Sequence, residues 1–383
     1  MAEPVVTEQG QRQAGEGLLF WLTGFVLLVG LPVLNVLPDP ESWIHVSDFA
    51  LNRFGKFLCF GILALGLDLI WGYTGILSLG HGVFFGLGAY AVGMHLMLTI
   101  GTESVYGSAL PDFMVWNQVK ELPLFWTPFY SFGVALAGAV LVPTLFAFLF
   151  GFLAFRSRIK GVYFAIITQA LALCAWLVFN RNETNLGGTN GLTDFKQILG
   201  FRLSEPGTQR ALYILTVLCL GAAYVVCRWI IRSRAGRVLV AIRDSEQRVL
   251  FSGYSPANYK LFVFVVSAAL AGLAGALYVP QVGIITPAQI GVLPSLEMVI
   301  WVAVGGRGTL IGAAMGAVGV NWARSVLTNY FPELWPFFLG GLFIAVVLLF
   351  PDGLVGLFAR MKDKWTASGL WVRKSTARSE SES

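Results

Sequence analysis

The sequence predicts an all-α polytopic integral membrane protein, and its composition carries that prediction. Hydrophobic residues make up 56% of the 383 residues and charged residues only 12%, against about 25% charged residues in soluble domains. Apolar runs of about 20 residues, the length that crosses the hydrocarbon core of a bilayer, recur from end to end. The runs lack the ten-residue alternation of a membrane β-barrel. A bundle of membrane-spanning helices is therefore expected.

About ten transmembrane helices are expected from these runs. The first 17 residues are polar and without signal-peptide features, so 1–17 is predicted to be a disordered cytoplasmic N-terminus and the first span is expected to be retained. A transmembrane permease domain is predicted over 18–360, followed by a basic cytoplasmic tail over 361–383. The expected spans are 18–37, 57–71, 78–99, 127–155, 161–180, 210–231, 261–280, 287–304, 309–328 and 334–350.

The distribution of Lys and Arg predicts the orientation of the bundle. Ten spans place both termini on one side of the membrane, and that side receives 18 of the 26 basic residues. Loops that stay in the cytoplasm are enriched in Lys and Arg. Both termini are therefore predicted to be cytoplasmic. The opposite side carries two sizeable loops, 100–126 and 181–209, and the second is either a docking surface for an extracytoplasmic partner or a solvated connector.

The one long charged segment between spans in the middle of the chain is 232–260. Inside it, Gly236–Phe251 has apolar residues at helical spacing and is predicted to be a short amphipathic helix, followed by Gly253 and Pro256 as stop signals. Such a segment is either an ordinary loop or a coupling helix that docks on a partner. The candidate docking residues are Arg237, Val238, Ile242, Arg243, Asp244, Glu246, Arg248 and Val249.

Polar residues within the apolar runs are candidates for a solute path. An acidic residue at mid-depth is costly and tends to face a cavity or a partner, although a structural pairing is the alternative. The segment from Val279 to Pro294 is too rich in Gly and Pro for a continuous helix, and broken backbone at that depth is tolerated where it lines a path or is buried in protein. The candidates are Asp68, Ser78, His81, Gln281, Thr286 and Glu297.

The absence of certain motifs argues against ATP binding and hydrolytic catalysis by this chain. It has no G-x-x-x-x-G-K-[ST] phosphate loop, no H-E-x-x-H and no nucleophile elbow. The four cysteines are scattered within apolar runs, and a lone histidine such as His81 is a poor metal site. No catalytic residue, metal, cofactor or nucleic-acid partner is expected. The combination predicts a transporter subunit whose ATPase is a separate chain.

Three segments resemble a known family. They are LGLDLIWGYTGILSLGHGVFFGLGAY at 65–90, GGTNGLTDF at 187–195 and LEMVIWVAVGGRGTLIGAAMGA at 296–317. All three are similar to the LivM-type permeases, which form the membrane half of branched-chain amino acid ABC importers. Within that family the match is closest to the permease subunit of urea transporters, because Asp68 and the run WVAVGGRGTL replace the Asn and the more aliphatic run of amino-acid permeases.

The resemblance implies a particular set of partners and a location. It implies a second homologous permease subunit, two cytoplasmic ATPase subunits and a periplasmic substrate-binding protein, with this chain as a multi-pass subunit in contact with lipid in a bacterial inner membrane. It places the ATPase contact in 232–260. Urea is the expected solute, with branched-chain amino acids or short amides as the alternative. A stand-alone urea channel is a further alternative. An enzyme is not expected, because the sequence contains no recognisable set of catalytic residues.

Overall fold

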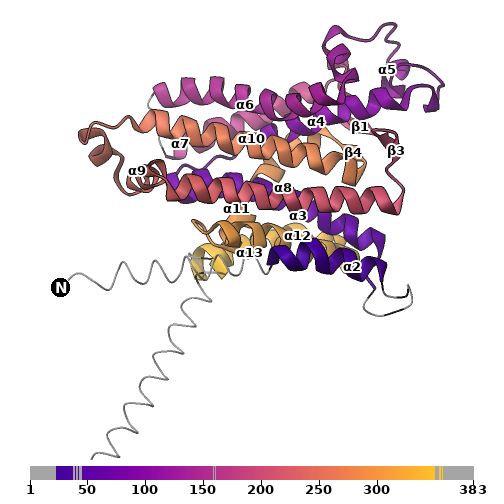
Figure 1. Cartoon of the computed structure of the whole chain (residues 1–383). Helices are drawn as coiled ribbons and strands as arrows, with labels where there is room; N and C mark the ends of the chain where they lie inside the picture. The colour runs from indigo at the N-terminus through magenta and orange to yellow at the C-terminus, as the bar shows by residue number, and fades with distance from the viewer. Residues whose placement is uncertain are drawn as a thin grey trace, which may run out of the picture.

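The chain is an all-α polytopic membrane protein, seen here in a computed structural model (Figure 1). The structure describes residues 23–37, 39, 42, 45–157, 159, 161–349, 353–354 and 356. The predicted N-terminal segment 1–17 and the predicted tail 361–383 lie outside the described residues. Long helices run side by side, and short elements gather at the two ends of the bundle (Figure 1).

Seven helices of the described chain are long and apolar enough to cross a membrane. They are α3 (Asp48–Thr74), α4 (His81–Ile100), α6 (Phe132–Arg156), α7 (Val162–Phe179), α8 (Pro206–Arg232), α10 (Pro256–Val282) and α12 (Leu310–Tyr330).

Three shorter apolar helical segments complete the bundle. The first joins a π-helical turn (Val26–Gly30) to α2 (Leu31–Val36), and the others are α11 (Val292–Gly305) and α13 (Trp335–Leu349). Each of the ten expected spans overlaps one of the ten helical segments in the described residues. Only seven are long enough to cross unaided, so the number of crossings and the side of the termini stay predictions.

Helices α3, α4 and α10 form the centre of the bundle. In their most apolar stretches, 83%, 89% and 72% of the residues are buried. Glycine makes this packing possible, because a Cβ at Gly275 of α10 would overlap the carbonyl oxygen of Phe85 on α4. The same holds for the G-x-x-x-G step of α12, where a Cβ at Gly316 would overlap the carbonyl oxygen of Trp301 on α11. These glycines therefore allow close helix packing within this subunit.

Helices α6 and α7 present their apolar side chains outward. Only 22% of the residues in the apolar stretch of each helix are buried, and large side chains such as Leu145, Leu149 and Leu153 are more than half exposed. An extensive exposed apolar surface of this kind is unusual for a soluble protein and suits contact with lipid or another membrane subunit.

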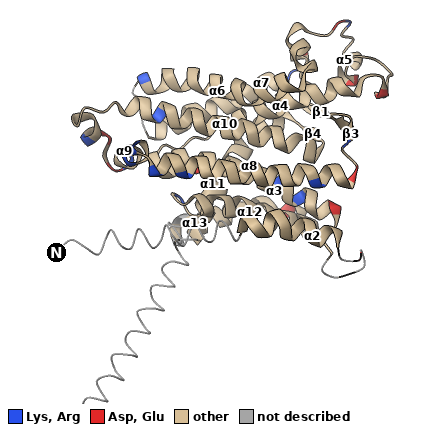
Figure 2. Cartoon of the chain, in the orientation of Figure 1, with Lys and Arg blue, Asp and Glu red and all other residues tan. Residues whose placement is uncertain are grey.

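The two ends of the bundle differ in structure. One end carries α9 (Arg234–Phe251) and a concentration of Lys and Arg (Figure 2). The other end carries α5 (Asp112–Trp116), four short strands and several 3-10 turns. The strands are β1 (Leu192–Thr193), β2 (Gln197–Ile198), β3 (Phe201–Arg202) and β4 (Ile284–Ile285). The turns are Gly101–Glu103, Leu124–Tyr130, Asn182–Thr184, Gly188–Asn190, η6 (Pro287–Ile290) and Pro332–Leu334.

A strand pair ties the loop after α7 to the break between α10 and α11. Strand β1 pairs antiparallel with β4, with Leu192 opposite Ile285. Gly191 has φ +68°, and a Cβ there would overlap the carbonyl oxygen of Ile285, so only glycine fits this approach. The loop 181–209 is therefore partly ordered against the helices. The interrupted backbone expected between Val279 and Pro294 is present, and it spans 283–291.

Candidate functional site

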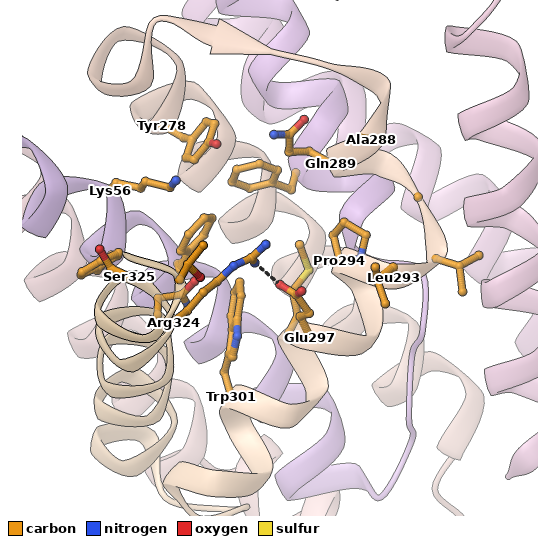
Figure 3. Close-up of a pocket in the computed structure, with 18 of the residues that line it drawn as sticks. Lys56, Tyr278, Ala288, Gln289, Leu293, Pro294, Glu297, Trp301, Arg324 and Ser325 are labelled. Carbon is orange, nitrogen blue, oxygen red and sulfur yellow. Dashed lines mark hydrogen bonds and ion pairs between the residues drawn. The ribbon is translucent and has the colours of Figure 1, made fainter. Parts of the chain in front are cut away.

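A chamber of about 810 Å³ lies between helices α3, α11 and α12, and α4, α7, α10 and η6 also contribute to its wall (Figure 3). It is lined by the first half of α3 and the last turns of α12, so it lies toward the end of the bundle opposite α9. The lining residues used below are Arg53, Lys56, Phe60, Phe85, Tyr278, Gln289, Glu297, Met298, Trp301, Asn321, Arg324 and Ser325.

An ion pair crosses the chamber between two helices. The Arg324 guanidinium of α12 donates to Glu297 Oε2 of α11 at 2.6 Å (Figure 3). The Glu297 side chain is 9% exposed and the Arg324 side chain 45% exposed. Of the six residues predicted for a solute path, Glu297 alone lines the chamber, and it is also paired with a neighbouring helix. Glu297 therefore both faces a cavity and makes a structural pairing, the two alternatives expected for an acidic residue inside an apolar run.

Aromatic rings form much of the chamber wall. The ring of Phe60 lies 4.8 Å from Trp301 and 5.6 Å from Tyr278, measured between centroids, and Tyr278 lies 5.2 Å from Phe85. These contacts present flat apolar faces beside a small number of polar groups, among them Gln289 and Asn321. A mainly apolar cavity with a few convergent polar groups is the usual form of a small-molecule site.

Glu297→Gln tests the pairing of the two helices. Glutamine keeps an oxygen acceptor but removes the charge, and Arg324 is too exposed for the loss to be large, so we expect about 1 kcal/mol of destabilisation. Thermal unfolding in detergent should show a small fall in Tm. The exchanged pair Glu297→Arg with Arg324→Glu should recover part of it. A Tm unchanged by Glu297→Gln would show that the ion pair adds nothing to stability.

Ser78 and His81 lie away from the chamber, in the packed centre of the bundle. The two His81 ring nitrogens lie 2.9 Å from Ser78 Oγ and 2.6 Å from Ser267 Oγ of α10, and Ser267 Oγ donates to the carbonyl oxygen of Gly66 on α3 at 2.6 Å. All three side chains are essentially unexposed. His81 therefore connects α4 to α10 and, through Ser267, to α3, which is a structural role.

Gln281 and Thr286 also make structural hydrogen bonds, Gln281 between α10 and α8 and Thr286 at the start of η6. Gln281 Nε2 donates to Thr216 Oγ1 of α8 at 2.6 Å and to the carbonyl oxygen of Leu277 at 3.1 Å. Thr286 donates from its backbone N–H and its hydroxyl to Gln289 Oε1, which fixes the start of η6. Neither residue lines the chamber. Thr286 contributes indirectly, because it orients Gln289, which does.

Asp68 holds the turn between α11 and α12. Its Oδ1 accepts from the backbone N–H of Gly308 at 2.7 Å, while Tyr73 Oη donates to the carbonyl oxygen of Gly308 at 2.9 Å. Gly308 has φ +79°, and a Cβ at Gly72 would lie 2.7 Å from its nitrogen. We call Asp68, Gly72, Tyr73 and Gly308 the turn clamp. Asp68 thus has a structural position, remote from the chamber.

Helix α9 is joined to this clamp by Arg243. Its Nη1 donates to the carbonyl oxygen of Gly72 at 3.0 Å. The neighbouring Arg307 stacks on the ring of Trp71 at 5.2 Å. Burial and then repulsion from Arg243 lower the pKa of Arg307 while Asp68 raises it, and the guanidinium stays charged at neutral pH. The middle of α9 is therefore in contact, through Arg243, with both α3 and the turn before α12.

The predicted helix over Gly236–Phe251 is present, and it is bent. Ser245 has φ −162° and ψ 98°, so α9 consists of two short limbs, and the Ser233 side chain accepts from the N–H of Gly236 at its start. The apolar stripe faces this subunit: Ile242 and Val249 are buried and Val238 is half-buried. Ile242 therefore packs within this chain, whereas Val238 and Val249 also line a groove on the outer side of α9, and the docking role of the segment stays a prediction.

The charged residues of α9 divide into inner and outer groups. Glu246 accepts from Lys260 Nζ at 2.7 Å and so fixes the second limb to α10, whereas Arg237, Asp244 and Arg248 are exposed. A groove of about 600 Å³ runs along the outer side, lined by Arg234, Arg237, Arg248, Tyr254 and Tyr259 among others. Leu250 and Phe251 add exposed apolar surface at the end of α9.

Lys56, Arg324 and Gln289 line the chamber but were not among the predicted path residues. Two of them carried a usable signal, since Arg324 lies inside an apolar run and Lys56 at the edge of another, and basic residues at such positions mark functional sites. Gln289 had no signal in the sequence other than its position in the interrupted segment from Val279 to Pro294. Among the described residues, no group of three or more His, Cys, Asp and Glu could hold a metal ion.

A helical membrane bundle that encloses a chamber of polar and aromatic residues has the features expected of a solute permease. Comparison with known families agrees. The chain belongs to the family described as the permease component of branched-chain amino acid transport systems, whose pattern matches residues 49–347.

Individual relatives are distant. The chain is 27% identical to the high-affinity branched-chain amino acid permease LivM of Escherichia coli K12 over 86% of this chain and 74% of that one. It is 24% identical to a probable LivM of Methanocaldococcus jannaschii (82% and 94% covered) and 23% identical to BraD of Pseudomonas aeruginosa (83% and 97% covered). No solved structure matches. The predicted family is confirmed, and the urea branch stays a prediction.

Proposed function

We propose that this chain is one of two permease subunits of an ATP-driven importer in a bacterial inner membrane. The observation that carries the proposal is the chamber, a cavity with an ion pair and aromatic walls inside a family of transport permeases. We further propose that a second, homologous permease subunit completes the path. Catalysis of ATP hydrolysis is assigned to partner chains.

The proposed contact with the ATPase subunit is at α9. The α9 end is rich in Lys and Arg, which supports a cytoplasmic location (Figure 2). The outer groove and the exposed Leu250 and Phe251 offer a surface for a cytoplasmic ATPase subunit. Arg243 and the turn clamp give that surface a contact with α3 and the start of α12. On the opposite end, the loop 181–209 is the proposed docking surface for a periplasmic binding protein.

The comparisons favour a branched-chain amino acid as the solute, which was the alternative in the sequence analysis. The relatives named above are branched-chain amino acid permeases. The chamber chemistry supports this choice, because Glu297 carries a negative charge, Lys56 and Arg324 carry positive ones, and the rings supply an apolar wall. A zwitterion with an aliphatic side chain needs these three kinds of contact.

Urea is the second candidate solute. Asp68 and the run WVAVGGRGTL resemble the urea branch, and identities below 30% do not transfer a substrate. Urea is planar, neutral and rich in N–H donors. The flat faces of Phe60, Tyr278 and Trp301 and the carboxylate of Glu297 offer stacking and hydrogen bonds that suit it.

The solute is tested with the complete transporter in proteoliposomes. Uptake of labelled leucine and of labelled urea is measured with and without internal ATP, and the partner binding protein is titrated with each solute by calorimetry. ATP-dependent uptake of either solute supports the importer, and the solute that the binding protein also binds is the substrate. Urea flux through this chain alone, without ATP, would instead establish a channel. Absence of uptake of both solutes would reject both assignments.

A further inference from the structure

Lys56 places a positive charge on the chamber wall between two aromatic rings. It lies on the third turn of α3, and its Nζ is 5.8 Å from the ring centroid of Tyr278 and 6.0 Å from that of Phe60. In the close-up, the ammonium group extends from α3 into the chamber, beneath Tyr278 (Figure 3). The side chain is half-buried rather than exposed to bulk solvent. Its position is therefore set by the walls of the cavity.

The other two basic residues of the chamber are already engaged. Arg324 pairs with Glu297 at 2.6 Å, and Arg53 donates to Ser325 Oγ at 2.9 Å while covering the ring of Phe49 at 4.4 Å. Within the part of the chain that the structure describes, Lys56 makes no hydrogen bond or ion pair. Glu297 attracts it over a longer distance, and Arg53 and Arg324 repel it. The ammonium group thus has three N–H donors and no acceptor.

A half-buried ammonium group without an acceptor is unfavourable, because it has lost water and gained only weak contacts with ring faces. An oxygen acceptor brought by a solute would supply the missing charge-assisted hydrogen bond. The cavity of about 810 Å³ has ample room for a small solute beside Lys56. On the wall formed by α11, Glu297 uses one oxygen for Arg324 and keeps acceptor capacity for N–H groups.

We infer that Lys56 is the residue by which the chamber holds the oxygen of its solute, a carboxylate or an amide carbonyl. The solute's N–H groups would then face Glu297, and its apolar part or its plane would lie on Phe60, Tyr278 and Trp301. This inference rests on the proposed function. It adds the chemical class of the solute: a small molecule with an oxygen acceptor at one end and N–H donors at the other.

The two sources of that oxygen respond differently to substitution. A carboxylate makes an ion pair with Lys56, whereas the carbonyl of urea makes a single charge-assisted hydrogen bond. Lys56→Met removes both. Lys56→Gln keeps an N–H donor without charge, so it should restore urea binding in large part and amino acid binding very little. Lys56→Arg keeps the charge and should retain transport of either solute.

The test measures initial uptake rates of labelled leucine and urea by the complete transporter in proteoliposomes. For the solute that the wild type transports, Lys56→Met should raise KM about tenfold or more, the effect of losing one charge-assisted contact, and change the maximal rate little. Lys120→Met, in an exposed loop, is the matched control and should behave as wild type. If Lys56→Met is not inserted, Lys56→Gln is compared with Lys56→Arg in the same assay.

The outcomes separate the two levels of the proposal. Uptake by the wild type with an unchanged KM in Lys56→Met overturns the role of Lys56 and leaves the importer intact. Absence of ATP-dependent uptake by the wild type overturns the importer itself. A raised KM in Lys56→Met supports the inference: recovery by Lys56→Gln then identifies a carbonyl oxygen, and recovery by Lys56→Arg alone identifies a carboxylate.

Discussion

Replacing both Arg243 and Arg248 by glutamate is expected to abolish ATP-dependent uptake while the protein still inserts into the membrane. Arg243 would lose its hydrogen bond to the carbonyl oxygen of Gly72, and a carboxylate would face that oxygen instead. Arg248 lies exposed along the outer groove, where charge reversal would repel a partner that recognises basic residues. Uptake in right-side-out membrane vesicles or proteoliposomes with internal ATP, normalised to the amount of inserted permease, measures the effect.

The two single variants divide this effect between two causes. Arg248→Glu changes only the outer surface, so its loss of uptake should come with loss of ATPase binding. Arg243→Glu changes a contact inside the chain, so the ATPase should still bind while uptake falls. Arg202→Glu, exposed at the opposite end of the bundle, is the control and should leave ATPase binding unchanged. Normal uptake by the double variant would reject a coupling role for α9.

Asp68→Leu is expected to lower both the Tm and the uptake rate. Leucine fills a similar volume but leaves the partly buried backbone N–H of Gly308 without its acceptor, which costs about 2 kcal/mol of stability. Of the two hydrogen bonds of the turn clamp to Gly308, only the one from Tyr73 Oη to its carbonyl oxygen would then remain. Because α12 carries Arg324, a shift of this turn would reach the chamber. Initial uptake rates and Tm in detergent are the measurements.

Two related variants make this result interpretable. Asp68→Asn retains an oxygen that can accept from Gly308, and its uptake should stay within about threefold of the wild type. Tyr73→Phe removes the second bond of the turn clamp and should give an intermediate loss. If Asp68→Leu lowers Tm but transports normally, the turn clamp serves stability alone. If it changes neither quantity, the hydrogen bond to Gly308 has no measurable role.

The helices of this protein are predictable because each depends on local sequence. Apolar runs, bounded by loops with Gly, Pro or charge, mark the seven long and three shorter apolar helical segments of the described chain. The amphipathic segment Gly236–Phe251 is likewise visible from its helical period, and α9 runs from Arg234 to Phe251. The bend at Ser245 is not visible in this way, because the period of the apolar residues passes through it unchanged.

The chamber is less predictable because it depends on which helices meet. Glu297 stands out as a charge inside an apolar run, but its partner Arg324 comes from a different helix. His81 and Gln281 stand out as polar residues inside apolar runs, yet their contacts with Ser267 and Thr216 on distant helices lie in packed surroundings away from the chamber. A polar residue in an apolar run thus signals a polar contact. Only the packing decides whether that contact lines a cavity.

The pairing of β1 with β4 has a consequence for how the chamber can change shape. Backbone hydrogen bonds between these strands brace the segment just before η6, where Gln289 is also held by Thr286. The opposite side, formed by α3 and α12, is joined there by side-chain contacts such as Arg53 with Ser325. Side chains rotate more readily than a strand pair slides. We therefore expect the η6 side of the chamber to be the more rigid one and the contact between α3 and α12 to be the more adjustable one.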